Sequence, residues 1–372
     1  LANSTAYSGG SSVDSVHKAV SRIGLAQIRE TVLNLEIVDR FAGLRCGRIR
    51  ADWFWEHSIA VGLIASRLAR RAGAGAEAGD AMFTAGLLHD IGRMLLTEVL
   101  ADQYGAVLQA AERLELPLEL VESRLLMVNH AELTDRVLRS WKFPPELINP
   151  IAFHHLTMGE ARQTVPSMME SVAILGLANR MAHALLIGSS GNEVIYPTRE
   201  HLRGLQVDPA LADELCEQVP PETAEMRMVL MARGSEGVAE SFEQQVQQRL
   251  RGAGPALSIS GAPGLDPFDR LAARLWGRSP ESPTAAVVYV HNPHEAEAAA
   301  AQLRAREAEI GRLLPAVVVS PTGTVGLPPD AQGGRYVQLL ACPTTIGRFA
   351  RALRAVCGLG DAPPPAGAKG SV

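Results

Sequence analysis

The sequence contains few cysteines and few lysines. Four cysteines occur among 372 residues, at positions far apart in the chain, and none forms a C-x-x-C pair. This spacing argues against a disulfide framework and against a structural zinc site, and it fits a reducing cytosol. Only Lys18, Lys142 and Lys369 supply lysine, so arginine carries most of the positive charge.

The sequence also lacks a strong charge of one sign and long apolar runs. The formal net charge is −5 and is spread along the chain, so no basic face predicts nucleic-acid binding. No apolar run is long enough to span a bilayer, and no charged-then-apolar leader opens the chain. We therefore expect a cytoplasmic protein with neither nucleic-acid nor membrane partners. Because the first residue is Leu1, we expect the sequence to begin inside a domain.

The apolar content is sufficient for two or three domains, since 47% of the residues are hydrophobic. Residues 1–188 have a helical pattern almost throughout and predict an all-helical domain, so the expected fold class is mainly α. Residues 189–282 are richer in Gly, Pro and acidic residues and predict a linker region, with a flexible stretch at 252–266. The helices expected in this region are 198–205, 208–217 and 221–250.

Residues 283–358 change to the pattern of a small α/β unit. Strands alternating with helices predict a parallel sheet. The expected strands are 285–290, 316–320 and 336–340, and the expected helices are 294–310 and 344–357. Residues 359–372 contain a run of Pro, Gly and Ala and are expected to form a disordered tail.

Several histidines and one aspartate are the strongest candidates for functional residues. They lie on helical, apolar stretches, where an unpaired polar group would be costly. Imidazole and carboxylate groups that converge in space can hold one or two divalent cations. The candidates are His57, His89, Asp90, His130, His154 and His155. A single histidine of this kind is more often a hydrogen-bonded core residue, and His183, one turn after Asn179, is expected to be structural.

The adjacent pair His89-Asp90 carries the most specific signal. Neighbouring residues on a helix diverge by about 100°, so both can bind one metal only at a bend or at a helix end. Gly92 supplies such a place, and Gly86 allows a neighbouring helix to approach closely. The helix that begins near Glu77 is expected to hold residues 85–92, with the pair at a bend or at the end of this helix.

The pair belongs to a longer motif that resembles a known superfamily. Gly86-Leu-Leu-His89-Asp90-Ile-Gly92 resembles the core of the HD superfamily of metal-dependent phosphohydrolases. The surrounding pattern is similar to one branch, the HDOD (HD-related output) domain, over roughly residues 1–188. The segments that carry this resemblance are 1–7, 19–24, 55–58, 141–144 and 151–155. The resemblance implies an all-helical HD-type bundle.

The same resemblance implies a metal site. His57 matches the first histidine of the superfamily, and His89-Asp90 matches its defining pair. The additional histidines of the two-metal members are matched by His130, His154 and His155. Asn179 stands in place of the closing aspartate, and a neutral amide neither adds a negative charge nor bridges two metals. A single weakly bound ion (Mn, Fe, Ni, Zn or Mg) or no ion is therefore expected.

Two functions are open from the sequence. The likeness to HDOD domains, which are signalling output modules, implies a bacterial regulatory protein that contacts other signalling proteins and retains a vestigial metal pocket. The alternative is a metal-dependent phosphohydrolase acting on a nucleotide or a phosphorylated small molecule, with Asp90 as a catalytic residue and Arg93 or Arg180 neutralising phosphate. The Gly- and Pro-containing loop of the HD-GYP branch is missing after His155, so cyclic dinucleotide hydrolysis is not expected. The amphipathic stretch 221–250 is a candidate surface for homo-oligomers.

The C-terminal unit has a weaker resemblance to a response-regulator receiver domain. Leu340-Ala-Cys342-Pro-Thr344 followed by an amphipathic helix is similar to the end of a receiver, where Lys-Pro closes the last strand. Cys342 replaces that lysine, and His291-Asn292 stand where acidic magnesium ligands are expected. Residues 283–358 are thus either a degenerate receiver-like domain or a small packing unit. Arg348, Arg351 and Arg354 are expected to form a solvated helix face.

Overall fold

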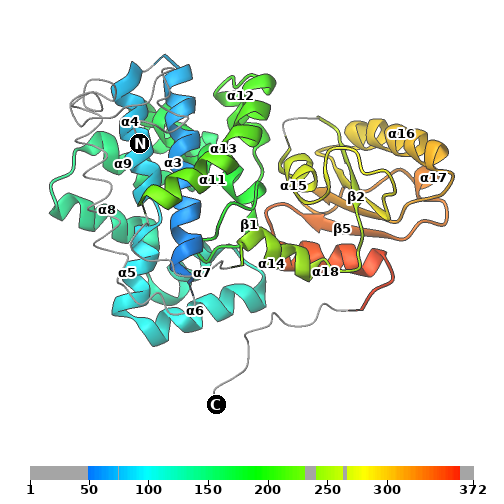
Figure 1. The fold of residues 1–372 in the computed structure, drawn as a ribbon, viewed down its shortest axis with the longest axis horizontal. Helices are drawn as coiled ribbons and strands as arrows, with labels where there is room; N and C mark the ends of the chain where they lie inside the picture. The colour runs from blue at the N-terminus through cyan, green and yellow to red at the C-terminus, as the bar shows by residue number, and fades with distance from the viewer. Residues whose placement is uncertain (1–48, 74, 231–239, 263–265, 361–372) are drawn as a thin grey trace.

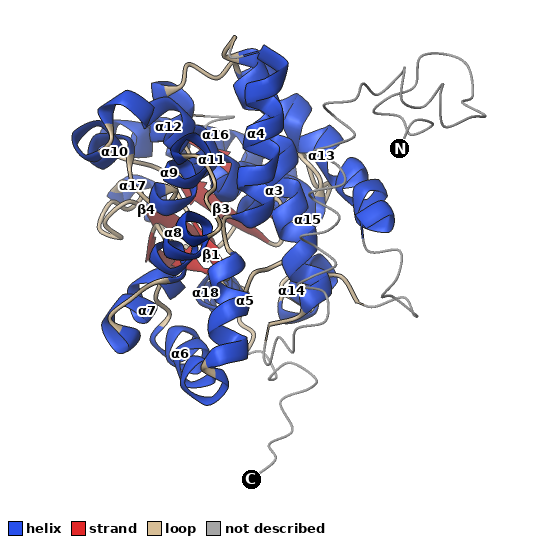
Figure 2. Cartoon of the chain, turned by 90° about the vertical axis from the view of Figure 1, so that its left-hand side faces the viewer, coloured by secondary structure: helices blue, strands red, loops and turns tan. Residues whose placement is uncertain are grey.

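The computed structural model of the chain describes residues 49–73, 75–230, 240–262 and 266–360 (Figure 1). The motif segments at 1–7 and 19–24 and nearly all of the tail predicted to be disordered lie outside these ranges. A large helical lobe and a smaller α/β unit lie side by side in Figure 1, and Figure 2 shows how small the strand content is beside the helices. Among the described residues, no helix has the length and apolar character needed to cross a bilayer.

The helical lobe is built around one apolar core, in which Phe54, Trp55 and Leu175 are fully buried. Its helices are α3 (Ala51–Arg71), α4 (Gly75–Leu88), α5 (Ile91–Val99), α6 (Ala101–Leu114), α7 (Leu118–Leu126), α8 (His130–Ser140), α9 (Pro145–Phe153), α10 (Met158–Thr164), the 3-10 turn η2 (Pro166–Met168) and α11 (Met169–Ala184). Helices α3 and α4 approach closely because two glycines face each other, as expected for Gly86. A Cβ on Gly86 would lie 2.4 Å from Cα of Gly62.

The linker region is helical, and its helices are α12 (Arg199–Gly204), α13 (Pro209–Leu230) and α14 (Phe242–Arg249), preceded by the short strand β1 (Val194–Ile195). Helix α12 confirms the helix predicted at 198–205. The predicted break before residue 221 is wrong, because Pro220 and Pro221 lie inside α13. Leu215 and Val219 are fully buried in the core of the helical lobe, so tertiary packing outweighs the low helix propensity of proline.

The α/β unit confirms the three predicted strands and both predicted helices. Its elements are β2 (Ala256–Ser260), α15 (Pro267–Trp276), β3 (Ala285–Tyr289), α16 (Pro293–Ile310), β4 (Ala316–Ser320), α17 (Pro329–Gln332), β5 (Val337–Ala341), β6 (Thr344–Thr345) and α18 (Ile346–Val356). The stretch 252–266, predicted to be flexible, contains the further strand β2. Its residues Leu257 and Ile259 are buried against the sheet's core, and its backbone pairs in parallel with β3.

The sheet is parallel, with the strand order β2-β3-β4-β5. Helices α15 and α18 contribute to the core on one face, while α16 and α17 contribute to the core on the other. Receiver domains have five strands in the order 2-1-3-4-5, so that the second strand lies outside the first. The described sheet has four strands that follow chain order. It confirms a small α/β unit, whereas the likeness to a receiver is not confirmed.

The helical lobe and the α/β unit are joined by backbone and side-chain contacts. Strands β1 and β6 pair antiparallel, with Val194 opposite Thr345. Arg199 of α12 forms an ion pair of 2.7 Å with Asp266 at the start of α15. Arg348 and Arg351 of α18 are exposed, as the predicted solvated face requires, and both also pair with Glu115 between α6 and α7.

Candidate metal centre

His89 and Asp90 lie in the turn between α4 and α5, which confirms the expected bend or helix end at this pair. Gly92 makes room here for the first turn of α8. A Cβ at this position would lie 2.2 Å from the carbonyl oxygen of His130, and the Gly92 amide donates to Oγ1 of Thr134 across 3.0 Å. Glycine at this position therefore lets His130 reach Asp90.

The histidines predicted as ligands converge on Asp90 in two groups. The first group is His57, His89 and Asp90, and the second is Asp90, His130, His154 and His155. Within each group the potential ligand atoms all lie within 4.8 Å of one another. Asn179 of α11 lies beside the first group, with its Oδ1 3.0 Å from Nε2 of His57. The structure thus brings together every residue that the sequence nominated for the site.

Two of the imidazoles are oriented by backbone carbonyl groups. Nδ1 of His89 lies 2.7 Å from the oxygen of Gly86, and Nδ1 of His154 lies 2.7 Å from the oxygen of Ile151. A carbonyl oxygen only accepts, so Nδ1 of each ring donates, and in the neutral ring Nε2 keeps its lone pair. These Nε2 atoms are buried, have no hydrogen-bond partner within the described residues, and lie 3.3 and 3.7 Å from the carboxylate of Asp90. Unpartnered nitrogen lone pairs beside a carboxylate fit a divalent cation.

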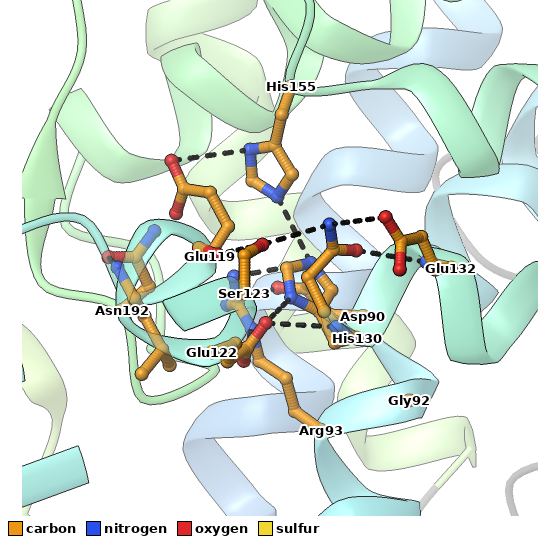
Figure 3. A network of polar contacts seen from close by, with 12 residues as sticks. Asp90, Gly92, Arg93, Glu119, Glu122, Ser123, His130, Glu132, His155 and Asn192 are labelled. Carbon is orange, nitrogen blue, oxygen red and sulfur yellow. Dashed lines mark hydrogen bonds and ion pairs between the residues drawn. The ribbon is translucent and has the colours of Figure 1, made fainter. Parts of the chain in front are cut away.

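His130 is oriented by a carboxylate instead (Figure 3). Its Nδ1 donates to Oε2 of Glu122 across 2.6 Å, and its backbone amide donates to the same oxygen across 2.9 Å. Tyr104 donates to the other oxygen of Glu122 across 2.7 Å. Nε2 of His130 lies 3.0 Å from Oδ1 of Asp90. A carboxylate behind a histidine is the usual support for a metal-binding imidazole.

The two carboxylates also change the basicity of His130. Burial and the neighbouring Arg93 both oppose a charged imidazole, but the attraction of Glu122 and Asp90 is stronger and raises the pKa of His130 to about 9. In the absence of a metal His130 is therefore an imidazolium between two carboxylates. A cation that binds at Nε2 has to displace this proton.

Asp90 is ionised, and two groups already donate to one of its oxygens. Arg93 donates to its Oδ2 across 2.7 Å, and the Ser190 hydroxyl donates to the same oxygen across 2.5 Å. Burial alone would raise the pKa of Asp90, but Arg93 and the histidines His89 and His130 hold it well below its usual range. Solvent reaches neither Asp90 nor Arg93. The central carboxylate is thus neutralised by a side chain of the same domain.

Burial keeps three further histidines neutral. Burial, followed by repulsion from His89, lowers the pKa of His57 to about 3. Burial also lowers the pKa values of His154 and His155 well below the usual range. Only neutral imidazole binds a metal, so these rings are ready to act as ligands. The ring of His183 lies 4.7 Å from that of His57, and its Nε2 has no hydrogen-bond partner in the described part of the chain.

Several residues that shape the pocket were not predicted from the sequence. Glu122 and Tyr104 look like ordinary members of amphipathic helices, and Ser190 lies in a Gly-Ser-Ser-Gly stretch that indicates only a loop. Of the two arginines named as phosphate partners, Arg93 points into the pocket. Arg180 donates to the backbone carbonyl of His155 across 3.3 Å.

Comparisons with known proteins match part of this chain to one domain family and to solved structures. Residues 1–157 match the HDOD domain family. The chain is similar in fold to an HDOD domain protein with unknown function from Geobacter sulfurreducens, with a TM-score of 0.50, 23% identity and coverage of 62% of this chain and 78% of that one. It also matches the MmoQ response regulator from Methylococcus capsulatus str. Bath, with a TM-score of 0.34, 23% identity and coverage of 57% and 75%.

A curated relative of the chain is an uncharacterized protein from Treponema pallidum (strain Nichols). The two are 23% identical over 180 residues, which make up 48% of this chain and 34% of the relative. The chain therefore spans about a third of the length of this relative. At these identities the solved structures bear on the fold alone.

Proposed function

We propose that this chain, which carries an HDOD domain at residues 1–157, is a bacterial signal-transduction module that works in the cytoplasm through contacts with other signalling proteins. The pocket around Asp90 serves regulation in this proposal and does not perform catalysis. It holds at most one divalent ion, or it remains a polar network that fixes the arrangement of five helices.

One observation carries this proposal. The guanidinium of Arg93, with no solvent exposure, donates to the carboxylate that both donor groups share. A catalytic metal needs an open position for water or substrate. Here His57, His89, Asp90 and His130 are also fully buried, and among the donor residues only His155 has a partly exposed side chain. A mostly buried and charge-balanced site favours a structural or sensory role.

The donor set nevertheless fits a metal. One ion would be held by the first group, with His57, His89, Asp90 and the oxygen of Asn179 as its ligands. This group is the better candidate because His130 and Arg93 place positive charge beside the second group. A divalent ion bound at such a site lowers the pKa of its water and polarises phosphoryl oxygens. The alternative function, hydrolysis of a nucleotide or a phosphorylated small molecule, is favoured by the sharing of Asp90 between two donor groups.

Metal analysis separates the two functions. The metal content of the purified wild-type chain is measured beside that of the His89→Ala and Asp90→Ala variants, together with a screen for nucleotide hydrolysis. We expect no turnover in any of the three proteins, with lower stability in the variants. Stoichiometric Mn, Fe, Ni or Zn in the wild type, with turnover that the variants lose, would replace the regulatory proposal by the hydrolase.

A further inference from the structure

The segment that connects α11 to α12 contacts the pocket at both of its ends. Near its start, the hydroxyl of Ser190 donates to the carboxylate of Asp90 across 2.5 Å. At its end, the ring of Tyr196 packs against two histidines of the pocket, with centroid distances of 5.6 Å to His183 and 6.4 Å to His155. We call residues 189–196 the connecting segment.

The middle of the connecting segment is bound to the α/β unit. Val194 and Ile195 form β1, which pairs with β6. The carbonyl oxygen of Glu193 accepts from the amide of Ile346, the first residue of α18, across 2.8 Å. Its carboxylate accepts from Arg249 of α14 across 3.0 Å. One short segment therefore joins Asp90 on one side to β6 and α18 on the other.

The connecting segment is held so tightly that it has little room to absorb a local shift. Ser190 and Asn192 are buried, and the side-chain amide nitrogen of Asn192 donates to the hydroxyl of Tyr196 across 2.7 Å. The Ser189 amide donates to the carbonyl of Trp53 across 3.0 Å. Just before the segment, Gly188 has φ of +60°, and a Cβ there would lie 2.2 Å from the same carbonyl. Packed elements of this kind move between discrete arrangements and do not deform continuously.

We propose that the connecting segment couples the state of Asp90 to the docking of the α/β unit. This inference rests on the proposed regulatory function, in which occupation of the pocket is the signal. Nε2 of His89 lies 3.3 Å from Oδ2 of Asp90, the oxygen to which Arg93 and Ser190 both donate, so a cation bound there by the first group would repel Arg93 and compete with Ser190. Release of Ser190 loosens the segment and with it the β1–β6 pairing. By linkage, loss of this pairing changes the affinity of the pocket for the cation by the same factor.

Hydrogen exchange of the full chain without metal tests the coupling directly. The amides of residues 344–346 report on the β1–β6 junction. Ser190→Ala removes the contact to Asp90, and we expect it to raise exchange at these amides about tenfold, a typical effect of losing one hydrogen bond to a charged group. Ser189→Ala is the matched control, since the Ser189 hydroxyl accepts from the Gly191 amide within the segment. It should leave exchange at residues 344–346 unchanged.

Two results of this comparison would overturn the coupling. The first is equal exchange at residues 344–346 in Ser190→Ala and in the wild type. The second is an equal rise in exchange in Ser190→Ala and Ser189→Ala, which would indicate general loosening of the connecting segment. Unchanged exchange of β3 and β4 shows that each variant is folded.

A second arm adds Mn²⁺ or Zn²⁺. Saturating metal should raise exchange at residues 344–346 in the wild type and have no further effect in Ser190→Ala. Metal binding without this change in the wild type contradicts the coupling. If the wild type binds neither ion, a cation is not the signal in the proposed function. The comparison of the two serine variants still tests the coupling in that case.

Discussion

The guanidinium of Arg93 donates to the carboxylate of Asp90 across 2.7 Å, and solvent reaches neither side chain. The two residues are one helical turn apart at the start of α5, so the ion pair forms wherever this turn folds. It supplies the positive charge that the shared carboxylate needs. We therefore expect the pocket to be stable without a metal.

Replacement of Arg93 should lower the stability of the metal-free protein. In Arg93→Met the Asp90 carboxylate loses its main partner, and a buried charge without a partner costs about 3–5 kcal/mol. Urea denaturation in EDTA should show this loss in the free energy of unfolding. Added Mn²⁺ or Zn²⁺ should then raise the free energy of unfolding more in Arg93→Met than in the wild type. Arg304→Met, which breaks a surface pair with Asp330, is the control and should change little. Equal stability of Arg93→Met and wild type without metal would contradict this interpretation.

Glu122 should control metal affinity, without touching the metal, only if the ion binds in the second group, where His130 would be a ligand. Its carboxylate fixes Nδ1 of His130 as the donor, so Glu122→Gln weakens both the orientation and the basicity of this ligand. Loss of such a partner typically lowers metal affinity about 10–100-fold. Isothermal titration with Zn²⁺ measures the effect if His130 is a ligand. Glu132→Gln, an exposed change on the first turn of α8, should bind as the wild type does, and the same affinity in Glu122→Gln would remove His130 from the ligand set.

Two glycines offer a matched test of the packing that builds the pocket. In Gly92→Ala the new Cβ would lie 2.2 Å from the His130 carbonyl, so α8 must move and we expect a loss of about 1–3 kcal/mol in unfolding free energy. Gly105 lies inside α6 with nothing within 4 Å of a Cβ. Gly105→Ala should therefore gain about 0.5–1 kcal/mol from helix propensity. A neutral Gly92→Ala would show that α5 and α8 do not need this close approach.

The pH dependence of stability should have two limbs in metal-free protein. The folded-state pKa of His130 is raised from 6.5 to about 9, so its contribution is complete below pH 6.5 and is lost as pH rises through 9. The folded-state pKa of His57 is lowered from 6.5 to about 3, so unfolding takes up a proton and stability falls as pH drops from 6.5 toward 3. Urea denaturation in EDTA should thus give a maximum near pH 6.5. His130→Gln should flatten the alkaline limb, and an unchanged limb would contradict the assignment.

The sequence predicted the ligands better than their surroundings. His89-Asp90 could be placed at a helix end because two adjacent side chains diverge on a continuous helix. Glu122 and Ser190 could not be predicted, since nothing local distinguishes a buried carboxylate or a pocket serine from a solvated one. These residues acquire their roles only when α7 and the connecting segment pack against α5 and α8.

The errors in the predicted fold have the same origin. Strand β2 looked like a linker because Gly, Ser and Pro flank it, and its pairing with β3 is a contact between distant residues. Helix α13 continues through Pro220 and Pro221 because its buried face packs against the helical lobe. In both cases tertiary contacts outweigh a local signal.

The most direct test of the central claim is phosphate release by the full chain in saturating Mn²⁺, measured with nucleoside phosphates and with p-nitrophenyl phosphate beside the Asp90→Asn variant. Asn at this position keeps the shape of the side chain and removes the charge that both donor groups share. A regulatory pocket without catalytic activity predicts the same background rate for both proteins. Turnover in the wild type that Asp90→Asn loses would contradict it.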